Sequence, residues 1–190
     1  MRRSKAHREF RFYSIMKSLG MNVPADVSFS EKRNPLRLLN QANIEMEALD
    51  AVDLRFFFAE DKYQELRQDK AFMKKAICAV AEQLSMMNQK HYFHLNLNFR
   101  NVLISTNVPS APKAWFIDCT AGTKNVLRIA NRMHYHRMKE VAFLYKYARH
   151  VCSLSEMVFF MHQYLGCNKL TQKHREFIQS LVAYTKKKWD

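Results

Sequence analysis

Two side chains with hard oxygen atoms, Asn101 and Asp118, lie at the borders of two short apolar segments. Asn101 directly precedes the apolar run 102–104, and Asp118 directly follows the apolar run 114–117. Two short strands joined by the polar segment 107–113 predict an antiparallel hairpin that places both side chains at one edge. Amide and carboxylate oxygens are the ligands that hold Mg²⁺ against nucleotide phosphates. A purely structural role for the asparagine, as a cap for its own backbone, stays an alternative.

The segment that leads into Asn101 starts at His94 and contains Asn96. Together with Asp118 it resembles the catalytic loop and metal-binding segment of the protein-kinase fold, His-x-Asp-x-x-x-x-Asn followed by a strand and an aspartate. The resemblance implies that Asn101 and Asp118 hold Mg²⁺ on the phosphates of ATP, and that His94 braces the loop. Asn96 stands where that fold has its catalytic aspartate. An amide can hydrogen-bond a substrate hydroxyl, but it cannot take the proton near neutral pH.

The elements that must position this stretch can be read from the spacing of apolar residues. With 48% hydrophobic residues in 190, the chain can bury a sizeable core as one domain or a little more. Helical spacing, with caps at Ser153 and Thr171 and a stop at Gly20, predicts helices over 4–19, 53–58, 72–87, 125–151, 153–166 and 171–188. Strands are expected over 27–30, 43–46, 102–104 and 114–117.

This order of elements resembles a protein-kinase domain from its first helix onward. The fuller resemblance is to the bacterial lipopolysaccharide kinase family, which phosphorylates Kdo or heptose. It is carried by residues 6–10, 19–24, 46–49, 52–54, 91–101 and 164–166. The resemblance implies an α+β, protein-kinase-like fold. Its mostly helical C-terminal lobe would span residues 59–190, and residues 1–58 would form a reduced N-terminal part of one helix, about two strands and a hinge.

The same resemblance implies roles for residues outside the loop. Glu9 takes the place of the glutamate that pairs with the ATP-orienting lysine, although a glutamate on a surface helix is ordinarily only solvated. Segment 46–49, with Glu47 and Leu49, corresponds to the hinge whose backbone meets the adenine. Glu140 stands where a helical aspartate ties down the catalytic loop. The glycine-rich phosphate loop and the lysine strand have no room upstream of Met1, so we expect a truncated family member or a partner that covers the sheet edge.

The charge and cysteine content narrow the partners. A formal net charge of +14 favours phosphate-rich partners: a nucleotide, a lipopolysaccharide core or lipid A precursor glycolipid, an anionic membrane surface and, less strongly, nucleic acid. A basic face carries Arg128, Arg132, His134, His136, Arg137 and Lys139. The four cysteines lack C-x-x-C spacing, and the histidine pairs lack zinc spacing, which favours buried thiols and structural histidines. No apolar run approaches about 20 residues, so we expect a cytoplasmic protein, peripheral on the inner face of the inner membrane.

The implied reaction is ATP- and Mg²⁺-dependent phosphorylation of a Kdo or heptose hydroxyl. A general base contributes about 10²–10⁴ in rate. Because Asn96 replaces that base, we expect the activity to be weak or lost. The alternative class is a non-catalytic pseudokinase, or a basic module that binds glycolipid, a membrane surface or nucleic acid.

Overall fold

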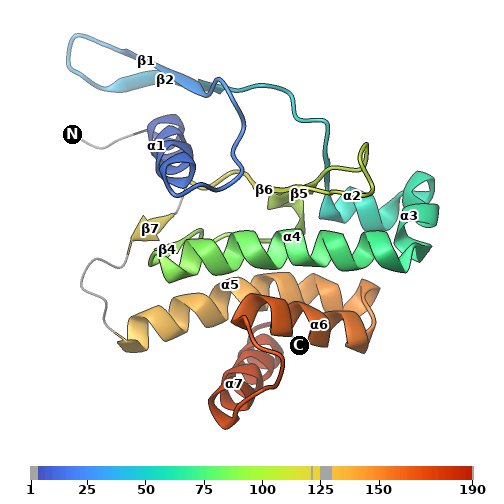
Figure 1. Cartoon of the computed structure of the whole chain (residues 1–190). Helices are drawn as coiled ribbons and strands as arrows, with labels where there is room; N and C mark the ends of the chain where they lie inside the picture. Colours follow the sequence, from blue (N-terminus) through green and yellow to red (C-terminus); the bar gives the residue numbers. More distant parts are fainter. Residues whose placement is uncertain (1–3, 121, 125–129, 190) are drawn as a thin grey trace.

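The computed structural model describes residues 4–120, 122–124 and 130–189. Helix α1 and a long two-stranded arm lie above a group of helices in which α4 is central and α5 and α6 run beneath it (Figure 1). Helix α7 lies below α5 and α6 in this view. Three small antiparallel sheets are inserted among the helices, so the predicted α+β class is confirmed.

The N-terminal part contains one helix and two long strands, as predicted. Helix α1 (Lys5–Ser18) begins after Ser4, whose hydroxyl accepts the backbone N–H of His7 at 3.0 Å. It ends before Gly20, which has a φ of 78°, a value that favours glycine. Strands β1 (Ser28–Arg33) and β2 (Leu39–Glu45) pair antiparallel. Both extend further than the sequence predicted, because their outer ends are polar and give no apolar alternation.

The middle of the chain runs through short elements into the long central helix. These are β3 (Val52–Asp53), α2 (Leu54–Ala59), the 3₁₀ turn η1 (Asp61–Tyr63), α3 (Gln64–Gln68) and α4 (Lys70–Gln89). The carboxylate of Asp53 caps α2 by accepting one backbone N–H, and that of Asp69 caps α4 by accepting two. The predicted helices at 53–58 and 72–87 are therefore confirmed.

The predicted hairpin is confirmed and is part of a three-stranded sheet. Strand β4 (Tyr92–Phe93) is followed by the 3₁₀ turn η2 (Phe99–Asn101), β5 (Val102–Ile104), β6 (Ala114–Phe116) and β7 (Thr123–Lys124). The sheet order is β3-β5-β6, and β4 pairs separately with β7. The sequence did not predict β3, β4 or β7, because a two-residue strand leaves no detectable periodicity.

The last three helices complete the core. They are α5 (Ala130–Val151), α6 (Leu154–Leu165) and α7 (Gln172–Trp189). The predicted helix 125–151 is confirmed from residue 130 onward, and its predicted residues 125–129 lie outside the described residues. The predicted cap at Ser153 is confirmed and is completed by Glu156 as a capping box, and α6 ends at Gly166 with a φ of 63°.

A single apolar core joins the two predicted parts. Phe12 of α1 belongs to the same buried cluster as Leu84 of α4 and Val141 of α5. The loop after α1 is also bonded to the larger part, because Asn22 donates its backbone N–H to Gln83 Oε1 at 3.1 Å. The division of the chain at residue 58 stays a prediction. Over the described ranges, we find no helix whose length and apolarity together suffice to span a bilayer.

Candidate functional site

Three asparagines close the loop between β4 and β5. Asn101 donates from Nδ2 to the backbone oxygen of Asn96 at 2.8 Å. Asn98 donates from Nδ2 to the backbone and side-chain oxygens of Asn96, both at 3.3 Å, and its own Oδ1 accepts the N–H of Arg100 at 3.2 Å. Asn96 is thus held from two sides at the position that the sequence assigned to the catalytic residue. Asn98 was not singled out from the sequence, although its spacing from Asn101 is that of a turn cap.

The hairpin brings Asn101 and Asp118 to the same edge. The backbone N–H of Ile117 donates to the oxygen of Asn101 at 3.0 Å, and Asp118 is the next residue. Asp118 is exposed and has a φ of 57°, an uncommon conformation for a residue with a side chain. Asn101 is 3% exposed and uses its amide nitrogen inside the loop, which leaves the amide oxygen for a cation. An amide oxygen beside an exposed carboxylate fits a hard divalent cation.

Glu9 contacts the backbone of Asp118. Its Oε1 accepts the N–H of Asp118 at 3.0 Å and the hydroxyl of Tyr13 at 2.9 Å. Burial is the main reason that the pKa of the Glu9 carboxyl lies above its ordinary value. No ion pair to Glu9 occurs among the residues that the structure describes. Glu9 therefore holds the backbone of Asp118, the candidate metal ligand, in place through this hydrogen bond.

His94 is fully buried beneath the loop. Its ring lies 5.6 Å from that of Phe12 and 6.5 Å from that of Phe116, measured between centroids. Nε2 lies 2.9 Å from the backbone oxygen of Ile117, and because a carbonyl only accepts, Nε2 carries the proton. Burial lowers the pKa of His94 to about 4, so the ring is neutral near pH 7. The neutral ring ties the start of the loop to the end of β6.

Glu140, on α5, joins the loop to the helical core. Its fully buried carboxylate accepts the backbone N–H groups of His94 and Leu95, the latter at 3.2 Å. It also accepts from Nδ2 of Asn88 at 2.6 Å. Burial raises the pKa of Glu140 to about 7, and these hydrogen bonds act in the opposite direction. The position assigned to Glu140 from the sequence is therefore one from which a glutamate reaches the loop.

Two polar residues that the sequence did not single out extend this network. Tyr164 on α6 donates its hydroxyl to Oδ1 of Asn88 at 2.7 Å, and it accepts Nε of Arg137 at 3.2 Å. Asn88 is 3% exposed at the end of the apolar stripe of α4. A buried asparagine in such a stripe must find partners, which is the signal that would have marked it.

The segment expected to meet adenine is anchored by Glu47. The backbone N–H of Ala25 donates to Glu47 Oε1 at 2.6 Å, and the N–H of Glu47 donates to the oxygen of Ala25 at 3.3 Å. The oxygen of Leu49 accepts the N–H of Ala51 at 2.8 Å. Both predicted residues thus lie in a connection whose shape is fixed by hydrogen bonds, while their contact with a nucleotide stays a prediction.

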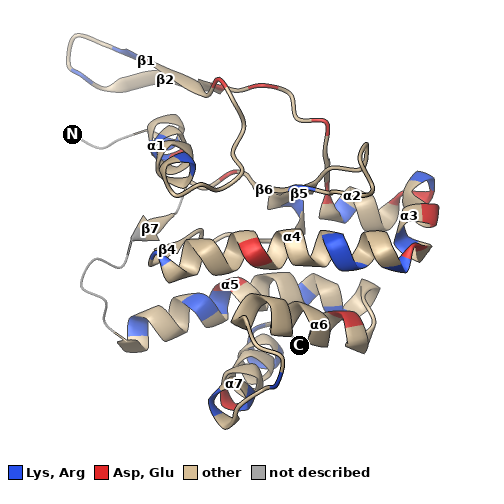
Figure 2. Ribbon diagram, in the orientation of Figure 1, with Lys and Arg blue, Asp and Glu red and all other residues tan. Residues whose placement is uncertain are grey.

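The predicted basic face is only partly free for a ligand. Arg137 bonds Tyr164, and the ammonium of Lys139 lies 5.9 Å from the ring centroid of Phe143. The rings of His134 and His136 pack on Phe177 and Phe93, respectively. Lys and Arg nevertheless recur along α5 and α7 in Figure 2, while Arg128 lies outside the described residues. In the described part of the chain, no three His, Cys, Asp or Glu residues gather in a metal-binding group.

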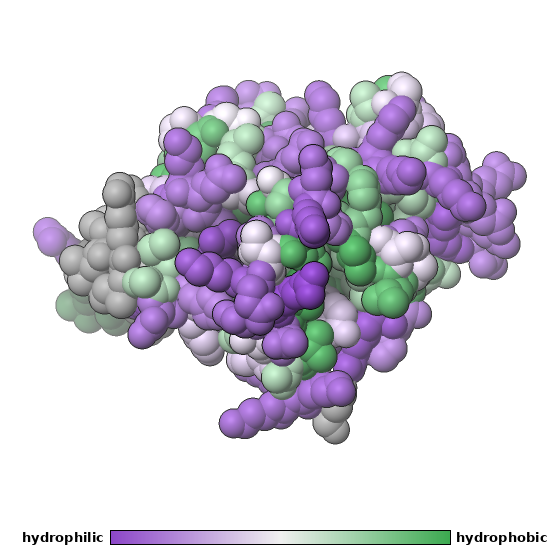
Figure 3. Space-filling model, turned by 60° about the horizontal axis from the view of Figure 1, so that its bottom comes forward, coloured by the Kyte–Doolittle hydropathy of each residue, from purple (hydrophilic) through white to green (hydrophobic). Residues whose placement is uncertain are grey.

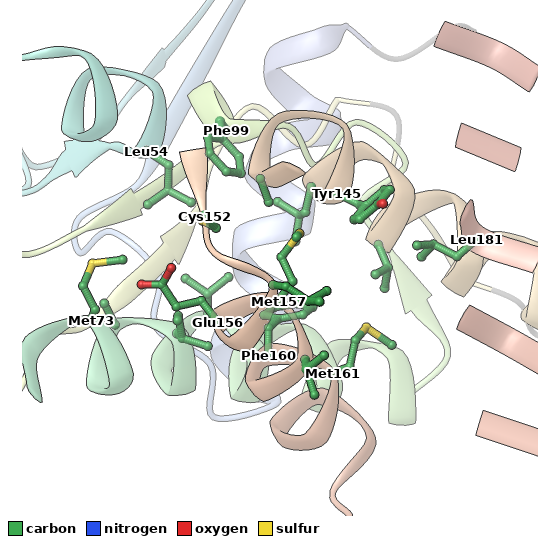
Figure 4. Close-up of a pocket in the computed structure, with 18 of the residues that line it drawn as sticks. Leu54, Met73, Phe99, Tyr145, Cys152, Glu156, Met157, Phe160, Met161 and Leu181 are labelled. Carbon is green, nitrogen blue, oxygen red and sulfur yellow. The ribbon is translucent and has the colours of Figure 1, made fainter. Parts of the chain in front are cut away.

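A second candidate site is an apolar cavity of about 240 Å³ among α2, α4, α5, α6 and α7. Phe99, Met157 and Leu181 point toward this cavity in Figure 4, and Glu156 lies beside it. Two lining residues, Leu154 and Val158, are 74% and 41% exposed, so the cavity reaches the surface. Hydrophobic residues also gather in the middle of the face shown in Figure 3, within a hydrophilic surround. No pattern in the sequence predicts this cavity.

The sequence model of the lipopolysaccharide kinase (Kdo/WaaP) family matches residues 1–164. The chain belongs to this family. The solved structure of WaaP in complex with acyl carrier protein is similar to it, with a TM-score of 0.70 and 19% identity. The match covers 96% of this chain and 74% of that one, and it shows the kinase-like fold that the sequence predicted. A search of curated proteins finds no match.

Membership in the lipopolysaccharide kinase family makes this a lipopolysaccharide kinase-like protein. That the loop from His94 to Asn101 corresponds to the family's catalytic segment stays a prediction from the sequence resemblance. In this chain the segment is folded and anchored, yet it has an amide where the family resemblance expects a carboxylate.

Proposed function

We propose that this protein binds Mg²⁺-ATP at the edge formed by Asn101 and Asp118, and that it transfers phosphate to a Kdo or heptose hydroxyl slowly or not at all. The observation that carries the proposal is the placement of Asn96. Asn98 and Asn101 hold it in a closed loop, which supports a formed loop with an amide at the position that the family resemblance gives to the base.

The residues of this chain supply positioning rather than proton transfer. The Asn101 amide and Asp118 carboxylate would hold the metal, which would supply charge neutralisation on the phosphates when bound. Glu9 and His94 fix the peptide unit that joins Ile117 to Asp118, because Glu9 accepts the N–H of Asp118 and His94 donates to the oxygen of Ile117. The side-chain oxygen of Asn96 can orient an acceptor hydroxyl as a hydrogen-bond acceptor, but it cannot carry the proton away.

Few groups in this chain are available to hold the phosphates of ATP. The 190 residues contain three glycines, at 20, 122 and 166, and so no glycine-rich phosphate loop. Glu47 and Leu49 are the residues proposed to lie beside the adenine, by family resemblance. We place the protein on the cytoplasmic side of the inner membrane, because a core glycolipid acceptor and the +14 charge both favour an anionic membrane surface.

Acyl carrier protein is a further candidate partner, since it is named in the complex of the similar WaaP structure. The apolar cavity supports this proposal, because its wall is almost entirely hydrocarbon and it reaches the surface at Leu154. A fatty acyl chain carried by such a partner has the chemistry to occupy it. This role is independent of Asn96 and can persist in a chain that has lost phosphoryl transfer.

The alternative is a non-catalytic module that binds glycolipid, membrane or nucleic acid through its basic residues. The three lysines in the last turn of α7 favour it, because they add positive charge at one end of a helix. Nucleic acid is the weaker of these ligands, because Arg137 of the basic face is bonded to Tyr164 and is not presented to a phosphate backbone.

A thermal-shift titration with Mg²⁺-ATP tests the nucleotide site. We expect the midpoint of unfolding to rise with nucleotide concentration, since a ligand that binds only the folded state stabilises it. Asp118→Asn should remove most of the Mg²⁺-dependent rise, whereas Asp61→Asn, at an exposed carboxylate in η1 outside the site, should retain it. A midpoint that does not move at millimolar Mg²⁺-ATP would contradict the proposed site and favour the non-catalytic alternative.

A further inference from the structure

The arm, residues 28–45, consists of β1, its turn and β2, and it projects beyond α1 in Figure 1. At its base the arm packs on α1, where the ring of Phe29 lies 4.8 Å from the rings of both Phe10 and His7. Residues 35–40 at the far end are all exposed. We call residues 34–39 the arm tip.

The arm tip has a fixed shape. The N–H of Asn34 donates to the oxygen of Leu38 at 3.0 Å, and Asn34 Oδ1 accepts the N–H of Leu38 at 2.8 Å. The N–H of Arg37 donates to the oxygen of Asn34 at 2.8 Å, and Arg37 has a φ of 61°. Arg33 bonds the oxygen of Arg37 at 3.2 Å and forms an ion pair with Glu31 at 2.7 Å. The turn is therefore built by specific bonds and not by burial of its apolar side chains.

This turn displays leucines to solvent. Leu36, Leu38 and Leu39 are 79%, 61% and 43% exposed, and no other large hydrophobic residue in the described part of the chain is as exposed as Leu36. Several exposed apolar side chains at one projecting point indicate a contact with an apolar partner. A standard protein interface needs about 800 Å² from each side, which a convex tip of six residues does not provide.

The charges around the tip match a lipid bilayer surface. Arg37 lies between Leu36 and Leu38, the two most exposed leucines of the arm tip, and Lys32 and Arg33 precede the turn. Apolar side chains beside arginine and lysine are the composition of elements that enter the boundary between head groups and acyl chains of anionic membranes. Glu31 is the nearest acidic residue in sequence, and it is paired with Arg33.

We propose that the arm tip is a membrane-inserting element. Leu36 and Leu38 enter the acyl boundary of an anionic bilayer, while Arg37 and Lys32 lie at the level of the lipid phosphates. The inference deepens the proposed function, since it rests on an acceptor glycolipid that lies in a membrane. The membrane contact is thereby assigned to the arm. The helices that line the apolar cavity take no part in this contact.

Vesicle co-sedimentation tests the proposal on the full chain, without nucleotide or sugar. Vesicles of phosphatidylcholine alone are compared with vesicles that contain one quarter phosphatidylglycerol. We expect Leu36→Ser with Leu38→Ser to weaken binding to the anionic vesicles about tenfold or more, because membrane affinity scales with the buried apolar area. Arg37→Gln should weaken it severalfold and reduce its sensitivity to salt. The matched control is Leu154→Ser, which removes a leucine of similar exposure on α6 and should leave binding unchanged.

Three outcomes would overturn the proposal. The first is equal vesicle binding by the wild type and the Leu36→Ser, Leu38→Ser variant. The second is a loss of vesicle binding by the Leu154→Ser variant and not by the arm variant, which would assign the contact to the cavity face. The third is no binding of the wild type to either vesicle, which would show that the arm tip does not enter a bilayer. Because the assay contains no nucleotide, none of these results bears on the Mg²⁺-ATP site. Unchanged thermal unfolding of each variant shows that the fold is intact.

Discussion

Glu140→Gln is the substitution whose effect on stability the structure defines most fully. The Glu140 carboxylate accepts three hydrogen bonds from the loop and from Asn88, and it is fully buried. A glutamine can still accept the two backbone N–H groups, but its amide nitrogen would face the donor Nδ2 of Asn88. One unsatisfied buried donor costs about 1–3 kcal/mol, and this cost does not depend on pH.

The charge of Glu140 adds a pH-dependent part with a definite sign. The pKa is about 7 in the folded protein and 4.5 for an ordinary glutamate. At about 1.4 kcal/mol for each pKa unit, the difference amounts to about 3 kcal/mol. Between pH 4.5 and 7 the folded state binds the proton and the unfolded state releases it, so the free energy of unfolding falls as pH rises. The penalty for Glu140→Gln should therefore be about 3 kcal/mol smaller at pH 8 than at pH 4.5.

The contribution of His94 must be separated from that of Glu140, because the two change the free energy of unfolding with pH in opposite directions. The pKa of His94 is lowered to about 4 from 6.5, so its contribution to stability is lost as pH falls from 6.5 toward 4. The wild type and the Glu140→Gln variant share His94, and the difference between their free energies of unfolding removes it. Urea denaturation of both proteins at several pH values from 4.5 to 8 gives that difference. A penalty that is constant across this range would refute the reasoning, since it would mean that Glu140 titrates alike in both states.

Three further predictions concern packing, capping and thiol reactivity. Gly122→Ala should lower the free energy of unfolding by about 1–3 kcal/mol, because a Cβ there would lie 2.6 Å from Sγ of Cys119; urea denaturation measures it, and an unchanged midpoint would contradict the packing. Ser153→Ala should cost about 1 kcal/mol through loss of the α6 cap, whereas Ser155→Ala should cost less, by the same measurement; equal costs would argue against the cap. Cys119 should react with iodoacetamide far more slowly than Cys167 in the folded protein, because it is 1% exposed and burial raises the pKa of its thiol; equal labelling by mass spectrometry would show that this part of the core opens readily.

The local rules of the sequence predicted those elements that contain their own signals. The capping box at Ser153 and the stops at Gly20 and Gly166 are satisfied by residues close in the chain, so spacing alone reveals them. The same is true of the hairpin that unites Asn101 with Asp118, because its two strands are neighbours in sequence. By contrast, the pairing of β4 with β7 joins two-residue strands far apart in sequence, and no local pattern marks it.

The parts of the site that the sequence missed depend on contacts between distant helices. Asn88 and Tyr164 come from α4 and α6, and only the packing of these helices brings them to Glu140 on α5, the one member of the network that the sequence assigned. The cavity likewise arises where several helices fail to fill the space between them, which depends on volumes and not on periodicity. The contact of Glu9 with the Asp118 backbone could not be predicted either, because the resemblance assigned that carboxylate to a lysine.

Phosphoryl transfer by Asn96→Asp tests the central claim most directly. The wild type, Asn96→Asp and Asn96→Asp with Asp118→Asn are incubated with Mg²⁺-ATP and an inner-core oligosaccharide that carries Kdo or heptose, and phosphate incorporation is measured by mass spectrometry. If Asn96 occupies the position of the missing base, the aspartate should raise the rate about 10²–10⁴-fold, and the second substitution should abolish the gain. Equal and robust rates for the wild type and Asn96→Asp would contradict the account, since they would show that proton removal does not depend on this position.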